Sequence, residues 1–299
     1  MALDGFTTPI LTMFGPKEEV DLGRNSQFAR DISECGVDHV FVLGSTGEFP
    51  SVLPSERKSL IDIVVESVSE RTDVWAGCGA PSTAQAVAFA EEAEELGVAA
   101  LVAVPPYYLH PSMIAVDHYY RAIRAAVSVP LLAYNNPSLV GYALPPALLH
   151  GLAKEGVLAG VKDSGGSLES VAGYLRGAPP GFEVLPGDPP LASAAIERGA
   201  RGAIMAVSNI APKLCVELVA AARRADWTRA HELQSVVDEL VSAVKAGPSI
   251  ATIKFLAATL RGTKVGYRAP YEPLSPAEEA TVLSKLEPLR PRLAPFLGK

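Results

Sequence analysis

A lysine near the middle of the chain stands where an apolar strand is predicted to end. Residues 156–161 read Gly-Val-Leu-Ala-Gly-Val, and Lys162 follows them directly. A lysine in this position must turn its ammonium into a cavity or leave the core. Burial disfavours the charged form of a lysine, and a neutral amine attacks carbonyl carbons. Lys162 therefore predicts an enzyme that binds its substrate covalently as a Schiff base.

The second predicted strand ends in a turn that suits an anion. Residues 44–48 read Gly-Ser-Thr-Gly-Glu, so the hydroxyls of Ser45 and Thr46 stand between two glycines. Hydroxyls and free backbone N–H groups at such a turn can hold a carboxylate or a phosphate. The same residues are also typical of a tight strand-to-helix turn, and the spacing leaves both interpretations open. We expect Glu48 to be a solvated residue of the first helical turn.

Tyrosines lie at the carboxyl ends of two further predicted strands. Tyr107 and Tyr108 follow the fourth predicted strand after two prolines, and Tyr134 ends the fifth. A phenol donates and accepts a proton, so a tyrosine near a lysine amine can shuttle protons. Each tyrosine alone is more typical of a half-buried rim residue. The combination of two hydroxyls, tyrosines and a lysine on one predicted rim is what favours a site.

Two aspartates near the same rim have plainer interpretations. Asp163 follows Lys162 directly, so the two side chains of a strand point to opposite faces, and we expect Asp163 to be a cap or a loop anchor. Asp188 follows Gly187 at the end of the seventh strand. Its carboxylate can bind substrate hydroxyls, but two prolines come next, and we expect Asp188 to cap the helix that begins there.

These residues share a rim only if the chain forms a barrel. Short apolar runs predict strands near 7–12, 39–43, 74–77, 99–104, 130–134, 156–161, 182–185 and 202–206. Amphipathic stretches predict helices near 24–35, 54–69, 82–96, 112–127, 144–153, 167–176, 190–198 and 210–224. This alternation is typical of a (β/α)8 TIM barrel, whose active site lies at the carboxyl ends of the strands. The first strand lacks the Gly-x-Gly-x-x-Gly turn of an open dinucleotide-binding sheet.

The pattern changes after residue 224. Helices are predicted near 226–246, 248–261 and 276–288, and no strand lies between them. We therefore expect a barrel over residues 1–224 and a C-terminal helical appendage over residues 225–299 that packs on it.

Composition excludes several classes of partner. The chain has 299 residues, a net charge of −7 and no basic run, which argues against nucleic acid as a partner. Its five histidines are far apart and its three cysteines form no Cys-x-x-Cys pair, so no metal site is predicted and a reducing compartment is favoured. Neither a signal peptide nor an apolar run long enough for a bilayer is visible. We expect a cytoplasmic protein without a membrane partner.

In its motifs the chain resembles the dihydrodipicolinate synthase/N-acetylneuraminate lyase family of class I, pyruvate-dependent aldolases. The resemblance covers nearly the whole chain, and a C-terminal signature appears at Arg268-Ala269-Pro270 and Pro273-Leu274-Ser275. The other motifs come in the family's order and spacing: Thr7-Thr8-Pro9-Ile10, 44–48, Tyr107-Tyr108, Tyr134-Asn135-x-Pro137, Val161-Lys162-Asp163-Ser164 and Gly187-Asp188. Each motif alone is weak, and six in register are strong.

The resemblance implies a role for each matched residue. Lys162 would form the Schiff base with the C2 keto carbon of pyruvate or of a pyruvate-derived substrate. Tyr134 would move protons to and from the substrate. Ser45 and Thr46 would hold the pyruvate carboxylate.

Further members of the site follow from the same resemblance. Gly187 and Asp188 complete the predicted substrate-binding set together with Ile204, whose backbone would lie near the pyruvate. Tyr108 matches a catalytic tyrosine that reaches into the neighbouring subunit's site in synthases of this family. The family is usually a tetramer built as a dimer of dimers, and it needs no metal or other cofactor. The implied partners are a small keto acid and further copies of the chain.

One departure bears on the substrate. Synthases of the family place an arginine after the Asn-x-Pro-Ser stretch to hold the carboxylate of the aldehyde partner, and this chain has Leu139 there. The motifs look closer to aldolases that cleave 4-hydroxy-2-oxoglutarate or a 2-keto-3-deoxy sugar acid to pyruvate and an aldehyde. Two alternatives stay open. The chain is a dihydrodipicolinate synthase in which another cation such as His110 replaces the arginine, or it is a non-catalytic module that binds a keto acid.

Overall fold

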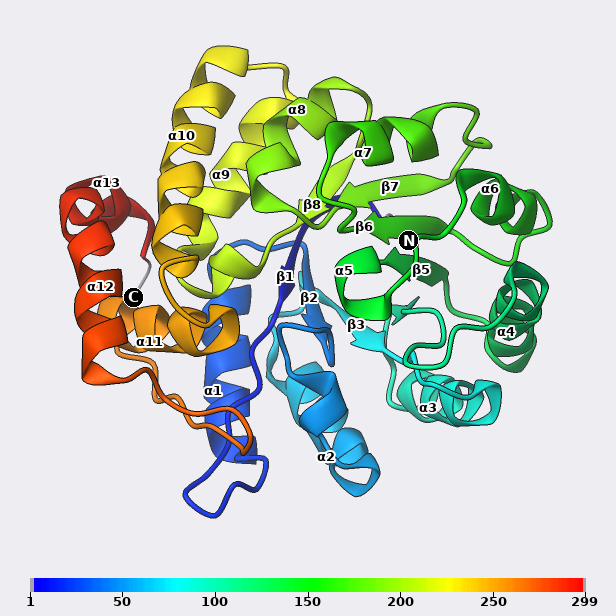
Figure 1. Cartoon of the computed structure of the whole chain (residues 1–299), viewed down its shortest axis with the longest axis horizontal. Coiled ribbons are helices and arrows are strands. Elements are labelled where there is room, and N and C mark those ends of the chain that lie inside the picture. The colour runs from blue at the N-terminus through cyan, green and yellow to red at the C-terminus, as the bar shows by residue number, and fades with distance from the viewer. Residues whose placement is uncertain (1–2, 298–299) are drawn as a thin grey trace.

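Eight parallel strands form one sheet that curves into a barrel. The computed structural model describes residues 3–297, and the strands follow the order β7-β6-β5-β4-β3-β2-β1-β8. Their bounds are Gly5–Pro9 (β1), His39–Val42 (β2), Asp73–Gly77 (β3), Ala100–Ala103 (β4), Leu131–Asn135 (β5), Gly160–Asp163 (β6), Glu183–Pro186 (β7) and Gly202–Ile204 (β8). Strand β1 pairs with both β2 and β8, and β7 lies beside β8, so the barrel is nearly closed (Figure 1). The predicted (β/α)8 fold is confirmed.

A helix follows every strand and covers the outside of the barrel. These helices are Leu22–Ser33 (α1), Pro54–Ser67 (α2), Thr83–Glu95 (α3), Met113–Ala126 (α4), Pro146–Lys154 (α6), Leu168–Leu175 (α7), Ala192–Glu197 (α8) and Pro212–Arg223 (α9). Local chemistry starts several of them. Ser82 caps α3 by accepting a hydrogen bond from the backbone N–H of Gln85 at 3.3 Å, as its position before the helix predicts.

Short helical turns at the rim were not predicted as separate elements. They are the 3₁₀ turns Phe49–Ser51 (η1), Pro189–Leu191 (η2) and Ala206–Asn209 (η3), and the four-residue helix Pro137–Val140 (α5). Each is too short to repeat an apolar pattern, so periodicity cannot reveal it. These turns stand between a strand and its helix and shape the mouth of the barrel.

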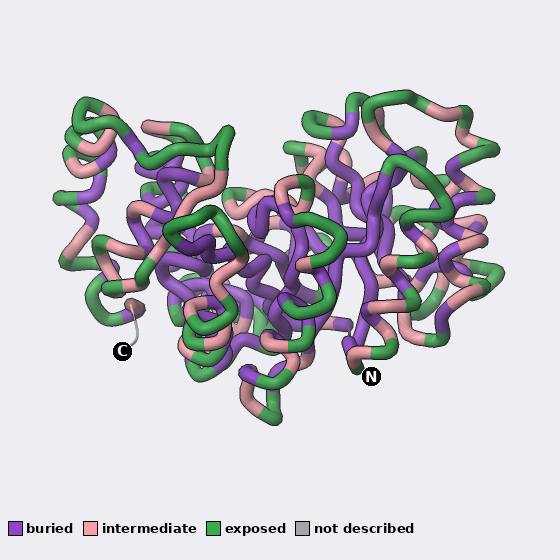
Figure 2. Tube along the Cα trace, turned by 90° about the horizontal axis from the view of Figure 1, so that it is seen from below, coloured by how far each residue is buried: buried purple, intermediate pink, exposed green. Residues whose placement is uncertain are grey.

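The C-terminal helices pack along one side of the barrel. They are Trp227–Val244 (α10), Ser249–Arg261 (α11), Pro276–Leu286 (α12) and Arg290–Leu293 (α13). Helix α10 lies against α9 (Figure 1), and buried side chains such as Leu218, Leu240 and Leu256 belong to one apolar core that barrel and appendage share. The buried part of the trace runs through both regions (Figure 2). The outer ends of the two predicted regions, residues 1–2 and 298–299, lie outside the described residues.

Within residues 3–297, no single helix is long and apolar enough to cross a membrane. Only α10 and α11 taken together, with a bend of 114° between them, reach the required length and composition.

Candidate active site

Lys162 and Tyr134 lie side by side at the carboxyl ends of neighbouring strands. The register of β5 and β6 pairs the two residues directly, and both are buried. The Nζ atom of Lys162 lies 4.1 Å from the centre of the Tyr134 ring and 5.0 Å from that of the Phe41 ring. Two aromatic rings therefore flank the amine, and the burial of Lys162 keeps it from bulk water.

The Tyr134 hydroxyl is held from two sides. It accepts hydrogen bonds from Nδ2 of Asn136 at 2.9 Å and from Oγ of Ser45 at 3.5 Å. Burial by itself raises the pKa of Tyr134, but the charge of Lys162 and hydrogen bonds from Ser45, Ser164 and Asn136 outweigh it, so the pKa is lowered. A more acidic phenol beside an amine is suited to proton transfer.

The turn after β2 brings Ser45 to the Tyr134 hydroxyl, and close contacts at its two glycines restrict the position of its backbone. A Cβ on Gly44 would lie 2.7 Å from the Phe41 ring, and one on Gly47 would lie 2.9 Å from the carbonyl oxygen of Ile10. The Thr12 hydroxyl donates to the carbonyl oxygen of Gly47 at 2.6 Å. Thr46 is buried in the same turn. The turn is therefore fixed at the site, as an anion-binding loop must be.

Glu48 is buried, so the prediction of a solvated helical residue is wrong. It adopts a left-handed backbone conformation with φ of 55°, and its carboxylate forms an ion pair with Lys254 of α11. Lys254 also donates to the carbonyl oxygen of Gly266 at 2.8 Å. Burial raises the pKa of Glu48 more than the attraction of Lys254 lowers it, and burial likewise lowers the pKa of Lys254. The pair ties the Ser45 turn to the C-terminal appendage.

Asp163 anchors the loop after β6, as predicted. Its Oδ1 atom accepts hydrogen bonds from Asn135 Nδ2 at 2.7 Å, from the Gly165 N–H at 3.0 Å and from the Ser170 hydroxyl at 3.0 Å. These contacts lie on the face of the strand opposite to Lys162. Asp163 therefore fixes the backbone that carries the lysine, without touching its amine.

Gly187 makes room for the side chains of Ser164 and Lys162. A Cβ at this position would lie 2.2 Å from Ser164 Oγ and 3.2 Å from Lys162 Cε. Asp188 does not cap the following turn, so that prediction is wrong. Its carboxylate accepts a hydrogen bond from the Gly166 N–H at 2.9 Å instead. The reason is that the loop after β6 lies close enough to Asp188 for the Gly166 N–H to donate to its carboxylate.

The remaining predicted residues lie at different depths. Ile204 is fully buried in β8, where it pairs with Thr7 of β1. Tyr108 is 89% exposed with φ of 73°, so the structure does not bring it to this chain's own site. Tyr107 faces the mouth, and its ring stands edge-on to that of Phe49 with centres 6.0 Å apart.

A cavity of about 220 Å³ opens above these residues. Ser45 and Asn136 form its inner side, and apolar residues such as Phe49, Leu139 and Ile250 form its walls. A narrower space reaches from it to Phe41 and Tyr134. A larger cavity of about 310 Å³ lies at the amino ends of β5 and β6, away from Lys162.

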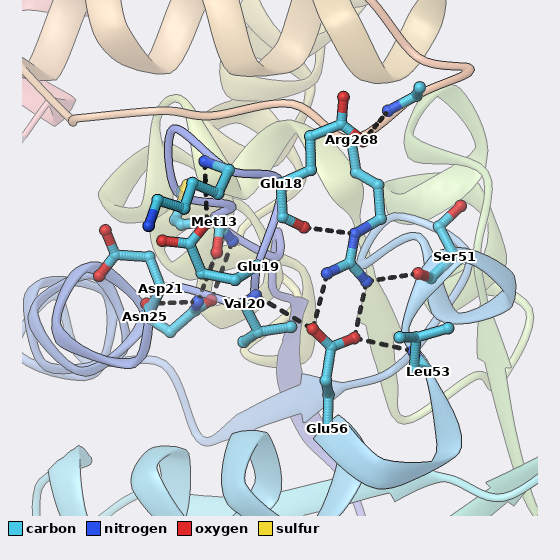
Figure 3. A network of polar contacts seen from close by, with 12 residues as sticks. Met13, Glu18, Glu19, Val20, Asp21, Asn25, Ser51, Leu53, Glu56 and Arg268 are labelled. Atoms are coloured by element: carbon cyan, nitrogen blue, oxygen red, sulfur yellow. Dashed lines mark hydrogen bonds and ion pairs between the residues drawn. The ribbon is translucent and has the colours of Figure 1, made fainter.

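Arg268 holds the segment that borders this cavity (Figure 3). Its Nη1 and Nη2 atoms donate to the two carboxylate oxygens of Glu56 at 2.7 and 2.6 Å, and Nη1 also donates to the Ser51 carbonyl oxygen at 2.7 Å. Its Nε atom donates to the carbonyl oxygen of Glu18 at 2.6 Å. Tyr271, which lines the cavity, is bonded through its N–H to the Arg268 carbonyl oxygen at 2.9 Å.

Several members of this arrangement were not predicted from the sequence. Asn136 and Arg268 stand inside motifs that were recognised, but nothing local marks the first as the partner of Tyr134 or the second as an anchor. Lys254 carries no signal, because it lies in an ordinary amphipathic helix. His110, considered as a substitute cation, packs against Tyr142 with ring centres 5.2 Å apart and does not line the cavity. Among residues 3–297, no three His, Cys, Asp or Glu side chains group to hold a metal ion.

Comparison with known proteins gives consistent results over nearly the whole chain. Residues 2–288 match the model of the dihydrodipicolinate synthetase family. An uncharacterized DapA-like lyase of Halobacterium salinarum is 37% identical over 290 residues, which is 97% of this chain and 95% of that protein. A 4-hydroxy-tetrahydrodipicolinate synthase of Bartonella bacilliformis is 32% identical over 286 residues, covering 95% and 97% of the two chains.

A solved structure has the same fold. YagE, a prophage protein of E. coli K12 from the dihydrodipicolinic acid synthase family, was solved in complex with pyruvate. It superposes with a TM-score of 0.92 at 28% identity, covering 97% of this chain and 99% of that chain.

Proposed function

The chain belongs to the dihydrodipicolinate synthetase family of pyruvate-dependent carbon–carbon lyases, as its motifs predicted, and from this premise we propose that it cleaves a 4-hydroxy-2-oxo acid to pyruvate and an aldehyde through an imine on Lys162. The observation that carries the proposal is the buried pair of Lys162 and Tyr134 beneath an open cavity.

The proposed reaction uses the geometry step by step. The Lys162 amine attacks the C2 keto carbon, Tyr134 gives its proton to the hydroxyl that leaves as water, and the resulting protonated imine withdraws electrons from C3. Tyr134 takes the proton of the C4 hydroxyl, the C3–C4 bond breaks, and its electron pair forms an enamine as the aldehyde leaves. Protonation of the enamine at C3 and hydrolysis of the imine release pyruvate and restore the amine. Ser45 and Thr46 hold the carboxylate throughout.

Trapping with borohydride in the presence of pyruvate tests the imine. We expect a reduced pyruvate adduct on the peptide that contains Lys162, and none in Lys162→Ala. Lys213→Ala, which changes an exposed lysine of α9, is the control and should trap as the unchanged protein does. An adduct on another lysine, or full cleavage activity in Lys162→Ala, contradicts the proposal.

Two alternatives are less well supported. A dihydrodipicolinate synthase condenses pyruvate with aspartate semialdehyde, and the name of the Bartonella bacilliformis relative favours this reaction. Leu139 offers no charge for the semialdehyde carboxylate, and His110 faces Tyr142 instead. A keto-acid-binding module without turnover is the other alternative. Pyruvate release from a panel of 4-hydroxy-2-oxo acids distinguishes it, since a binding module releases none.

We also propose a homotetramer in which Tyr108 serves a neighbouring subunit's site. Tyr108 and Leu109 in the loop before α4 are 89% and 78% exposed, and Ile114 in the first turn of α4 is 71% exposed. Such apolar surface is typical of an interface. Size-exclusion chromatography with light scattering tests this assembly, and a monomer contradicts it. The cytoplasmic location stays a prediction, which fractionation of the source cells checks.

A further inference from the structure

We propose that the aldehyde released by this enzyme carries an uncharged, mainly apolar substituent, either alkyl or aryl. This inference rests on the proposed function, because it concerns the part of the substrate beyond the pyruvate. With the carboxylate at Ser45 and Thr46 and C2 at Lys162, the C4 substituent must point towards the open side of the site. That side is the cavity of about 220 Å³ above Ser45 and Asn136.

The cavity offers no positive charge to a carboxylated substituent. None of the residues that line it is a lysine, arginine or histidine, and all of them lie within residues 3–297. Its one charged side chain is that of Glu48, which is acidic and already paired with Lys254. A second carboxylate, as in 4-hydroxy-2-oxoglutarate, would enter without a partner, and an unpaired charge in a partly enclosed site is strongly disfavoured.

The polar groups of the cavity are also largely occupied, which disfavours a polyol. Asn136 donates through Nδ2 to the Tyr134 hydroxyl at 2.9 Å, and its Oδ1 accepts from the Ser138 hydroxyl at 2.9 Å. Ser45 is directed at Tyr134. Of this chain's own residues, the phenols of Tyr107 and Tyr271 remain for a sugar chain that brings several hydroxyls. Hydroxyls that lose water without gaining a partner weaken binding.

The walls of the cavity match an apolar group. Phe49, Val104, Val140 and Ile250 line it from four different parts of the chain. Leu139 stands at the lip on α5 and is 67% exposed, although its neighbour Val140 is buried. An apolar substituent that enters the cavity would cover Leu139, and removal of this apolar surface from water favours binding.

Condensation in the reverse direction tests this proposal with four aldehydes at equal concentration. The enamine carbon C3 attacks the aldehyde carbon, whose oxygen takes its proton from Tyr134, and hydrolysis frees Lys162. We expect kcat/KM for 3-methylbutanal and for benzaldehyde to exceed that for glyceraldehyde and succinic semialdehyde by about tenfold or more. The two apolar aldehydes distinguish an alkyl from an aryl substituent.

Leu139 provides the specificity test. In Leu139→Arg, a cation at the lip should raise kcat/KM for succinic semialdehyde about tenfold and lower it for the apolar aldehydes. Leu139→Gln, similar in length and uncharged, is the matched control and should give no gain for succinic semialdehyde. A preference for either polar aldehyde in the unchanged protein, or an equal response of all four to Leu139→Arg, overturns the inference.

Exchange of pyruvate C3 hydrogens with deuterium in heavy water distinguishes a failure of the proposed function from a failure of the inference about the aldehyde. Exchange requires the imine and the enamine but no aldehyde. If pyruvate does not exchange, the proposed function fails and the inference fails with it. If pyruvate exchanges and the polar aldehydes are preferred, or none of the four reacts, only the inference about the aldehyde is overturned.

Discussion

The ion pair between Glu48 and Lys254 makes a sharp prediction, because both side chains are almost completely buried. Their side-chain exposures are 1% and 0%, so water cannot replace either partner. In Lys254→Met the methionine fills similar space but leaves the Glu48 carboxyl without its cation. Removing one partner of a buried pair lowers the free energy of unfolding by about 3–5 kcal/mol, and we expect a loss of this size at pH 7.

The loss should depend on pH in a direction that follows from the pKa of Glu48. Burial already raises this pKa above its ordinary value of 4.5, and removal of Lys254 raises it further. The folded variant then binds more protons than the unfolded chain, so its stability falls as pH rises above 4.5. Lys254→Met should therefore be less stable at pH 7 than at pH 5, and one extra proton bound in the folded state sets an upper limit of about 1.36 kcal/mol per pH unit on that difference.

Urea unfolding at fixed protein concentration, at pH 5 and pH 7, measures these quantities. Lys264→Met, which changes an exposed lysine, is the control and should stay within about 0.5 kcal/mol of the unchanged protein. Glu48→Met combined with Lys254→Met should recover most of the loss, because no buried charge is left alone. If Lys254→Met is as stable as the control at pH 7, or if the double variant recovers nothing, the reasoning is refuted.

Two further predictions follow from the contacts around the site. The Arg268 guanidinium lowers the pKa of Glu56 below its ordinary value of 4.5. The ion pair therefore stabilises the folded protein above pH 4.5, and this stabilisation is lost as the pH falls through the pKa of Glu56 in the folded protein. Glu56→Gln should therefore be less stable than the unchanged protein by about 1.5–3 kcal/mol at pH 7. Thermal melts should show this difference shrinking towards pH 3, and an equal difference at pH 7 and pH 3 contradicts the prediction. Gly187→Ala should displace Lys162 and slow borohydride trapping about a hundredfold while melting stays cooperative, and an unchanged trapping rate contradicts the close contact.

Much of the fold was predictable because its signals are local. The apolar run at 156–161 and the alternation around it predicted the existence of β6 and its neighbours, since burial on both faces selects continuous apolar residues in parallel strands. The bounds were less accurate, because β6 begins four residues later, at Gly160, and includes Lys162. Ser82 predicted the start of α3 through capping chemistry that spans three residues. Helix α5 escaped because four residues cannot establish a period, although its position decides where Leu139 stands.

The candidate site was predictable in its residue types and only partly in its contacts. Lys162 and Tyr134 were expected on one rim, and the register of β5 and β6 brings them together. The residues that hold these side chains and the neighbouring loops in place were not expected. Asn136 holds the Tyr134 hydroxyl, whereas Asp188 bonds the loop after β6 rather than a helix end. Such choices depend on which donor another loop presents, and no local pattern carries that information.

By itself, the sequence determined the alternation of strands and helices, the rim on which the candidate side chains gather, and the lysine among them that we propose as the nucleophile. Tertiary structure alone decided that Glu48 is buried against Lys254, that Gly187 makes room for Lys162, and that apolar walls surround the entrance. The physical reason is the separation along the chain over which each interaction acts. Backbone period and capping act over a few residues, whereas an ion pair between positions 48 and 254 exists only after folding brings distant segments into contact.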